Sequence, residues 1–444
     1  MKKRRLTPVQ AVILSFMAVI ALGALLLMCP FSSREGVWTG FIDALFTATS
    51  AACVTGLVTL DTAAHWSGAG QGIILALIQI GGLGAMTIIT GFFVSVVRKR
   101  SSLSSTRMLM QAAGNDSFTG QVRLVKRLFL GTVIFELTGA VLLAIRFVPL
   151  FGWGRGLWFS VFHSVSAFCN AGFDVLGDFR GGASLSAFAS DPLIILTISA
   201  LIVLGGLGFI VWDDLINEKF HFRRLKFHSK IVLVTTAVLV VFPTALFFLL
   251  EGNAAFAGTG VWNRLLMSFF QAVTPRTAGF AAVPMSSLSD AGAVLTMVLM
   301  LIGGSPGSTA GGIKTTTIAV MVICTAASMK KSEPVAFKRR IEDDTVRQAT
   351  AIVLIYIAAS VAASMVLCAV DAVALRDAAF EVISAIATVG LSTGITASLS
   401  GVGKLLLTAL MFAGRIGGLT MAIALTGERS ASPVKQPGGK LIVG

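Results

Sequence analysis

The sequence predicts an all-α integral membrane protein in which four tandem repeats surround one pore with pseudo-four-fold symmetry. Three observations lead to this fold class. Apolar residues make up 55% of the 444 positions and charged residues only 13%, and the mean hydropathy is +0.87. Several apolar runs reach the roughly 20 residues that a helix needs to cross about 30 Å of hydrocarbon. A short pattern centred on one glycine also recurs four times along the chain.

The basic residues predict how the chain faces the membrane. The formal net charge is +14, and the basic residues gather at the start of the chain, at 98–107, at 123–127, at 218–230, at 330–347 and in the C-terminal tail. Because basic loops stay in the cytoplasm, both termini and all these segments are expected there. Neighbouring basic segments are then joined by an even number of crossings. Topology accounts for the charge, so no nucleic-acid partner is expected.

The sequence indicates neither a cleaved leader nor a catalytic or cross-linking group. The first apolar run extends from Val9 to Cys29, which is longer than the apolar core of a signal peptide, so it is predicted to be a retained helix. The five cysteines lie in apolar segments without a C-x-x-C pair, which predicts no disulfide framework and no metal site. No G-x-S-x-G motif and no carboxylate pair at one membrane depth is visible, so an enzyme is not expected.

Four segments share one pattern. They read FTATSAACVTGL (46–57), FHSVSAFCNAGF (162–173), FFQAVTPRTAGF (269–280) and FEVISAIATVGL (380–391). Aligned on Gly56, Gly172, Gly279 and Gly390, they share a phenylalanine ten residues earlier: Phe46, Phe162, Phe269 and Phe380. A serine stands six residues before the glycine in three of them (Ser50, Ser166, Ser384), with Val273 as the exception. The glycines are 116, 107 and 111 residues apart, which predicts repeats at 1–115, 116–225, 226–340 and 341–444.

Each shared segment is too short to cross the bilayer. Ten to fourteen apolar residues suggest a re-entrant segment, which is tolerated only where the backbone is buried in protein or lines an aqueous cavity. We therefore expect helix, pore helix, filter loop and helix in each repeat, giving eight transmembrane helices and four re-entrant pore helices. The alternative is a symmetric helix bundle with no pathway, which does not explain why one glycine recurs.

The four loops are predicted to form a filter for K⁺. Rings of backbone carbonyls can replace the hydration shell of a monovalent cation, and the negative C-terminal ends of pore helices favour a cation. Glycine can adopt φ > 0, which turns carbonyls inward. No loop contains a carboxylate, which favours potassium or sodium over a divalent ion. The predicted filter residues are Val54, Thr55, Gly56, Asn170, Ala171, Gly172, Thr277, Ala278, Gly279, Thr388, Val389 and Gly390.

The stretch GGSPGSTAGGIKTTT (303–317) resembles a phosphate loop but misses its pattern. Ile313 stands where the lysine of a P-loop belongs, and Lys314 comes one place late. As one helix, 290–330 would be about 60 Å long, twice the hydrocarbon thickness, so it must break here. We interpret it as an intramembrane gate below the filter; the alternative is a kink for close packing. The predicted gate residues are Gly303, Gly304, Gly307, Ser308, Thr309, Gly311, Gly312, Lys314 and Arg415.

Charged side chains at membrane depth are functional candidates. Arg415 is predicted to act as a barrier to cations on the pore axis or as an anchor for the gate, and the alternative is an ion pair with Glu136 or Asp213. The stem of Lys314 is long enough to reach the cytoplasm. Arg276 is expected to point behind the third filter loop, because a cation that faced a cation path would be repulsive.

The four-fold duplication with one glycine per filter resembles the Trk/Ktr/HKT potassium transporters. VTPRTAGF (273–280) and GGSPGSTAGGIKTTT (303–317) are the most specific matches, and the resemblance covers essentially the whole chain. It is closest to the Ktr-type membrane subunit of bacteria. The resemblance implies potassium uptake across the cell membrane, with Na⁺ dependence in several members. It also implies a homodimer that docks on a cytoplasmic ring of RCK-domain subunits, which bind ATP or ADP, and no cofactor in this chain.

Two other transport functions stay open. The same fold could pass sodium or monovalent cations without selection; glycine at all four filters favours potassium. A secondary solute transporter is less favoured, because such proteins usually contain inverted repeats, whereas these four repeats all start from the same side.

Overall fold

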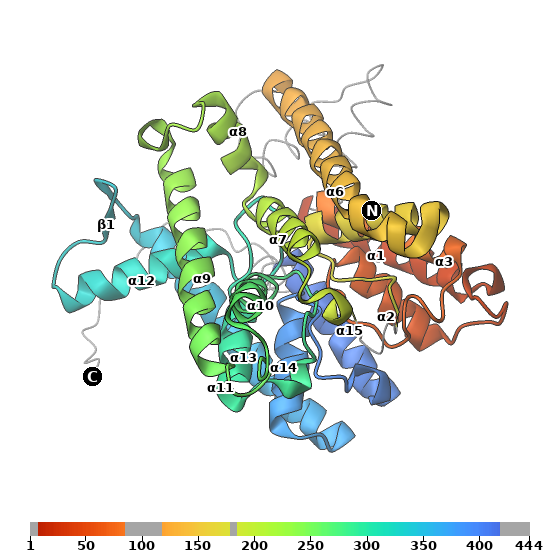
Figure 1. Ribbon diagram of the computed structural model, residues 1–444. Coiled ribbons are helices and arrows are strands. Elements are labelled where there is room, and N and C mark those ends of the chain that lie inside the picture. The colour runs from red at the N-terminus through yellow and green to blue at the C-terminus, as the bar shows by residue number, and fades with distance from the viewer. Residues whose placement is uncertain (1–7, 85–117, 178–183, 418–444) are drawn as a thin grey trace, which may run out of the picture.

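The computed structural model describes residues 8–84, 118–177 and 184–417, and its described part is almost entirely helical (Figure 1). The basic segments predicted at the start of the chain, at 98–107 and in the C-terminal tail lie outside these residues.

The first half of the chain forms two helical units. The first contains α1 (Pro8–Met28), η1 (Pro30–Ser32), α2 (Phe41–Ala52) and α3 (Gly68–Leu83). The second contains α6 (Phe118–Phe168), η3 (Ser186–Phe188), α7 (Pro192–Gly206), α8 (Phe209–Asn217) and η4 (Phe222–Arg224). Helix α6 is interrupted at Gly152, whose φ of 78° and ψ of 169° are not helical. It is therefore a long helix followed by a shorter one.

The second half forms two further helical units. Its third unit contains α9 (Phe227–Leu250), α10 (Val261–Val273), η5 (Met285–Ser287), α11 (Asp290–Leu301) and α12 (Thr315–Met329). An antiparallel hairpin of β1 (Val335–Ala336) and β2 (Arg339–Arg340) follows. The fourth unit contains α13 (Asp343–Asp371), α14 (Leu375–Ile386), η6 (Thr396–Ser398) and α15 (Gly401–Ile416). The first and last units meet, because α2 packs against α15 (Figure 1).

Several helices are long and apolar enough to cross a membrane. Three within the described residues pass this test: 127–168, Phe227–Leu250 and Asp343–Asp371. The pair α7 and α8 would be a fourth span, bent by 93° at the break between the two helices. Shorter apolar helices surround them, so the eight predicted crossings stay a prediction.

One local device starts the helix that follows the predicted filter loop in three units. The sequence S-x-x-G occurs at 67–70, 289–292 and 400–403, and each serine caps its helix by accepting the glycine N–H at 3.0–3.2 Å. Helix α7 begins instead at Asp191, whose carboxylate accepts two backbone N–H groups. Capping satisfies backbone donors that a helix start leaves unpaired. It fixes where each helix begins after its predicted filter loop.

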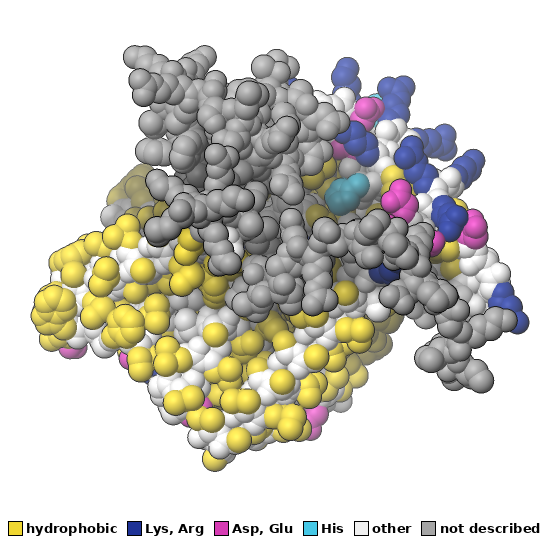
Figure 2. Space-filling view, turned by 180° about the vertical axis from the view of Figure 1, so that it is seen from behind, with side chains coloured by type: hydrophobic (Ala, Val, Ile, Leu, Met, Phe, Trp, Pro, Cys, Tyr) yellow, Lys and Arg dark blue, Asp and Glu magenta, His cyan; other side chains and the backbone are white. Residues whose placement is uncertain are grey.

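Side chains on the surface separate into two regions. Apolar side chains cover much of the face in Figure 2, whereas Lys and Arg gather at one end. Exposed basic residues of this end come from the η4 region and the β-hairpin: Lys219, Arg223, Arg224, Lys226, Lys338, Arg339 and Arg340. A broad apolar surface with a basic end is the pattern of a protein that is embedded in lipid.

The interior is packed around the short helices that precede the predicted filter loops. Phe46, Phe162 and Phe380 are fully buried, as a repeated core position requires. In the third unit the fully buried ring is Phe270, whereas the aligned Phe269 is only partly buried. The alignment on phenylalanine is therefore offset by one residue in α10.

Candidate functional site

The four repeated glycines lie together in one ring. A methyl group built on Gly56 would collide with the carbonyl of Ala171, and one built on Gly172 with the carbonyl of Ala278. The ring closes in the same direction. A methyl group on Gly279 would meet the carbonyl of Val389, and one on Gly390 would meet the carbonyl of Thr55. All four have positive φ, between 69° and 95°, so only glycine fits their backbone without strain.

The residue two places before each glycine is also left-handed. Val54, Asn170, Thr277 and Thr388 have φ values of 57°, 59°, 64° and 53°. Such values are rare for β-branched residues. After α2, the N–H of Val54 bonds to the carbonyl of Ala51 at 3.1 Å, and that of Thr55 to the carbonyl of Ser50 at 2.8 Å. This is a Schellman motif, whose left-handed position usually holds glycine.

The end of α6 and the end of α14 repeat these two hydrogen bonds, but α10 ends differently. Its last helical residue is Val273, six places before the repeated glycine, whereas the other three short helices end four places before it. Pro275 follows, and it has no N–H to continue the helix. The N–H of Ala278 reaches back to the carbonyl of Thr274 at 3.0 Å instead. The third loop therefore arrives at the same ring by a different turn.

The carbonyls of all twelve predicted filter residues have no hydrogen-bond donor among the described residues. Eleven of these residues are buried, and Gly390 is half-buried. Buried carbonyls are almost always paired. A ring of unpaired carbonyl oxygens, converging from four loops, is the donor set that a dehydrated monovalent cation requires.

A hydroxyl group braces every loop. In the first and fourth loops, the Oγ atoms of Ser50 and Ser384 accept the N–H of the ring glycine at 3.0 Å. In the second loop, Ser166 donates to the carbonyl of Phe173 at 2.7 Å. In the third loop, Thr274 donates to the carbonyl of Phe280 at 2.5 Å. The sequence alignment missed Thr274, because it took Val273 for the equivalent residue; the neighbouring hydroxyl was the signal.

The predicted gate stretch is an irregular segment between α11 and α12. Helix α12 begins at Thr315, so the predicted end at residue 317 is wrong by three residues; Thr315–Thr317 are helical because Lys314 is already the N-cap. Within the segment, the N–H of Gly303 bonds to the carbonyl of Ile313 at 2.9 Å. This bond closes the base of the stretch into a loop.

The loop is attached to the second unit and lies against the fourth. The N–H of Ser305 bonds to the carbonyl of Gly206 at 2.9 Å, and the N–H of Phe209 to the carbonyl of Gly307 at 3.0 Å. Both bonds lie at the break between α7 and α8. On the other side, a methyl group on Gly311 would collide with Thr388. The loop therefore adjoins the filter ring, and its glycines permit the close approach.

The two cations of the predicted gate both bind loop carbonyls. Arg415 donates to the carbonyl of Thr309 at 2.5 Å and to that of Gly81. Lys314 donates to the carbonyl of Ala310 at 2.7 Å, so its side chain folds back onto the loop and does not reach for the cytoplasm as its long stem allowed. The remaining predicted gate residues lie in the same loop. Gly304 and Gly312 are buried, and Ser308 is half-buried.

The alternative partners suggested for Arg415 are engaged elsewhere. Glu136 accepts from Gln79 at 3.2 Å, and its backbone carbonyl accepts from Ser164 at 2.6 Å. Asp213 pairs with Arg127 at 3.0 Å. Among the described residues, Arg415 thus forms no ion pair. Through Gln79, Glu136 joins α6 to α3.

Arg276 and Glu381 lie beside the loops. The Arg276 side chain is buried and has no hydrogen bond or ion pair within the described residues, whereas its carbonyl accepts from Asn170 at 3.3 Å. Sequence reasoning missed Glu381, which is fully buried in α14. It accepts from Ser392, from the N–H of Thr393 at 3.2 Å and from Thr396 at 2.8 Å. A carboxylate within the shared segment 380–391 was the available signal.

The chain is similar to known transport proteins over almost its whole length. The TrkH family, described as a cation transport protein, matches residues 2–430. The potassium/sodium uptake protein NtpJ of Enterococcus hirae is 43% identical, over 100% of this chain and 99% of that protein. The Ktr system potassium uptake protein B of Bacillus subtilis is 37% identical, over 99% of this chain and 97% of that protein.

A solved structure shares the fold. The potassium transporter TrkH from Vibrio parahaemolyticus matches with a TM-score of 0.75 and 18% identity, over 96% of this chain and 86% of that one. The family match spans nearly the whole sequence, and the relatives align from end to end. This chain therefore belongs to the TrkH family of cation transport proteins.

Proposed function

We propose that this chain is the ion-translocating membrane subunit of a potassium uptake system. The observation that carries the proposal is the ring of unpaired carbonyls from four loops. Uptake of potassium is named for relatives that align over their full length. The four loops would each supply carbonyl oxygens, and the left-handed residue and the glycine of each loop would turn them toward a dehydrated K⁺.

The loop between α11 and α12 would be the gate. It adjoins Thr388 of the fourth filter loop, and Arg415 donates to its Thr309 carbonyl. In this position the loop narrows the route on one side of the ring, and Arg415 adds a positive charge to it. Opening would require the Arg415 contact to break and the loop to move on its glycines. Two hydrogen bonds tie the gate to the second repeat: Ser305 donates to Gly206, and Phe209 donates to Gly307.

The surroundings of the chain follow from the same proposal. The four repeats would run 1–115, 116–225, 226–340 and 341–444, with both termini in the cytoplasm. The basic end seen in Figure 2 would then face the cytoplasm. There it could receive a ring of nucleotide-binding RCK subunits, with two copies of this chain forming a homodimer in the cell membrane.

A sodium-permeable pathway is the second candidate. The relative in Enterococcus hirae is named a potassium/sodium uptake protein. One glycine per loop constrains the carbonyls less than a longer glycine-rich filter would. Sodium would then permeate beside potassium or drive its uptake.

Cation flux into liposomes tests both candidates. The purified chain is reconstituted in vesicles loaded with potassium or with sodium, and flux is followed with and without an RCK ring. Gly279→Ser is the test variant, because any side chain there meets the Val389 carbonyl. Gly258→Ser is the matched control: its φ is also positive, at 74°, but nothing lies within 4 Å.

Potassium flux that Gly279→Ser reduces or makes less selective, and that Gly258→Ser leaves unchanged, is the expected result. Equal potassium and sodium flux in the unmodified chain would favour the second candidate. Absence of flux even with the RCK ring, from folded protein, would overturn both.

A further inference from the structure

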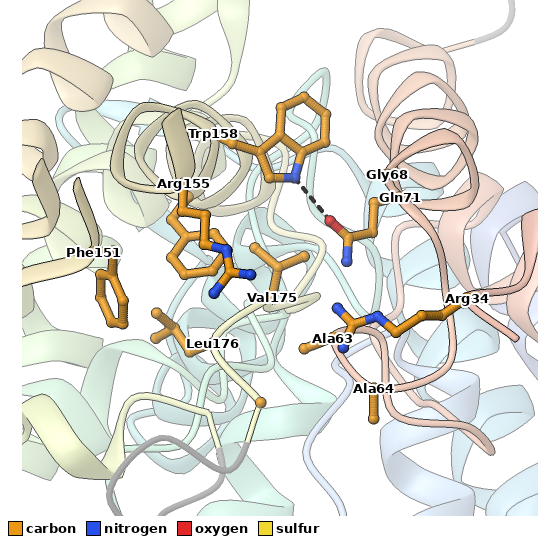
Figure 3. A pocket seen from close by; sticks show the side chains of 12 residues that line it. Arg34, Ala63, Ala64, Gly68, Gln71, Phe151, Arg155, Trp158, Val175 and Leu176 are labelled. Carbon is orange, nitrogen blue, oxygen red and sulfur yellow. Dashed lines mark hydrogen bonds between the residues drawn. The ribbon is translucent and has the colours of Figure 1, made fainter. Parts of the chain in front are cut away.

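A cavity of about 830 Å³ lies between the first and second units. Its wall includes Ala63 and Ala64, which follow the first filter loop, and Val175 to Gly177, which follow the second. Figure 3 shows Arg34 and Arg155 entering from opposite sides, with both guanidinium groups directed into the hollow. Neither arginine belongs to the filter or the gate.

The rest of the wall is apolar or already paired. Phe151, Trp158 and Phe159 form an aromatic side, continued by Leu176. The Trp158 ring donates to the Gln71 side-chain oxygen at 2.8 Å, and the Gln71 nitrogen donates to two backbone carbonyls at 3.3 Å. Among the described side chains of this wall, the two arginines are therefore the ones whose N–H donors are unpaired.

The two guanidinium groups have no acidic partner in the part of the chain that the structure describes. Neither has a carboxylate within 4 Å or a hydrogen bond from its side chain among the described residues. Some other arginines do have such partners, as Arg146 has in Asp191 at 3.0 Å and Arg376 has in Asp290 at 2.6 Å. Both arginines are exposed, so two cations at one hollow are free to bind an anion from outside the protein.

The form of the cavity indicates which anion. Planar guanidinium groups match phosphate oxygens with two parallel hydrogen bonds. The aromatic wall would cover the glycerol and the upper acyl carbons that follow a lipid phosphate. Trp38 and Trp153 are 71% and 76% exposed, and exposed tryptophans are typical of the headgroup level.

We propose that this cavity binds a phosphate-bearing anionic headgroup, supplied by a phospholipid of the leaflet opposite the basic end. The phosphate lies between Arg34 and Arg155, and the acyl end lies against Phe151 and Phe159. The occupant also contacts Val175 and Leu176, three and four residues after Gly172 of the second loop. Headgroup binding therefore stabilises the segment that follows this loop.

Native mass spectrometry of the full-length chain tests the proposal. The protein is purified from nanodiscs of phosphatidylcholine that contain a minor fraction of phosphatidylglycerol, and retained phosphatidylglycerol is counted. The unmodified chain should retain one molecule that R34Q/R155Q retains at least about tenfold less, since hydrogen bonds to charged groups are lost. R34K/R155K should be intermediate, because lysine keeps the charge without the planar fork.

A second variant and a second ligand make the test decisive. Ala64→Trp fills the cavity without changing its charge and should expel the same lipid, even if loss of both arginines harms folding. Inorganic phosphate is added to delipidated protein while thermal stability is measured. Stabilisation by phosphate that requires both arginines, without preferential retention of phosphatidylglycerol, would overturn the lipid source. Equal retention by all variants, with no effect of phosphate, would overturn the site.

Discussion

The first and fourth of the predicted filter loops differ from the second and third in the group to which the bracing hydroxyl is hydrogen-bonded. Ser50 and Ser384 accept the glycine N–H, whereas Ser166 and Thr274 donate to the carbonyl after the glycine. The ring order places the first loop beside the fourth and the second beside the third. One side of the ring is therefore held by its N–H groups and the other by its carbonyls.

The difference decides which carbonyls remain available. Those of Phe173 and Phe280 are used by the braces, whereas those of Leu57 and Leu391 have no donor among the described residues. The carbonyls of the four glycines can form a four-fold ring. Of the described carbonyls one residue later, only those of Leu57 and Leu391 are free, and both lie on the same side of the ring. Four repeats of one pattern thus produce a two-sided site.

The largest effect is expected from Gly390→Ala, which breaks the ring itself. An added methyl group would collide with the Thr55 carbonyl, and φ of 95° strains any L side chain. We expect potassium flux in liposomes to fall by more than about tenfold, since a shift of about 1.4 kcal/mol already changes a rate tenfold. Gly394→Ala is the control, because its φ is 103° with nothing within 4 Å. Similar losses in both variants would mean that backbone strain, and not the ring, matters.

Arg415→Gln should have the next largest effect. It releases the loop between α11 and α12, which is bonded to the second unit and lies against Thr388 of the fourth loop. Hydrogen bonds from a charged group are each worth about 1.5–3 kcal/mol, and Arg415 donates to two carbonyls. Flux without a partner should rise severalfold while the protein stays folded. Arg415→Lys should behave in between. Unfolding of Arg415→Gln, seen in a melting curve, would assign Arg415 to stability alone.

Ser384→Ala sharpens the comparison on the N–H side. It leaves the N–H of the half-buried Gly390 without its acceptor, at a cost of at most about 3 kcal/mol. The fourth loop should lose order, and the ratio of sodium to potassium flux should increase. Ser384→Thr keeps the hydroxyl and is the control. An unchanged flux ratio in Ser384→Ala would show that the Schellman turn alone holds the loop.

Thr274→Val tests the carbonyl side and should have the smallest effect. The variant keeps the shape of the side chain and removes one donor from the Phe280 carbonyl, a loss of about 0.5–1.5 kcal/mol. The freed carbonyl can then join the ion path, so potassium flux should change less than in Ser384→Ala. Thr274→Ser is the control. A larger loss of flux in Thr274→Val than in Ser384→Ala would reverse the comparison.

Much of the site was predictable from local pattern. The repeated glycines predicted positions of positive φ, and all four have it. The length of 290–330 required a break, and the chain is irregular from the end of α11 at Leu301 to Thr315. The roles of these residues in selection and gating, and the count of eight crossings, stay predictions. Thr274 was missed because Pro275 changes how α10 ends, which an alignment of spacings does not record.

The sequence by itself determined the class of the molecule: apolar runs, basic segments and four glycines are local properties, and each has a direct physical meaning. Only the tertiary structure decided the partners. Arg415 binds the carbonyls of Thr309 and Gly81, more than 100 residues away, and Glu136 bonds to Gln79. Such contacts depend on where helices cross, and spacing along one chain does not contain that information. The same reason explains why the cavity between Arg34 and Arg155 emerged only from the fold.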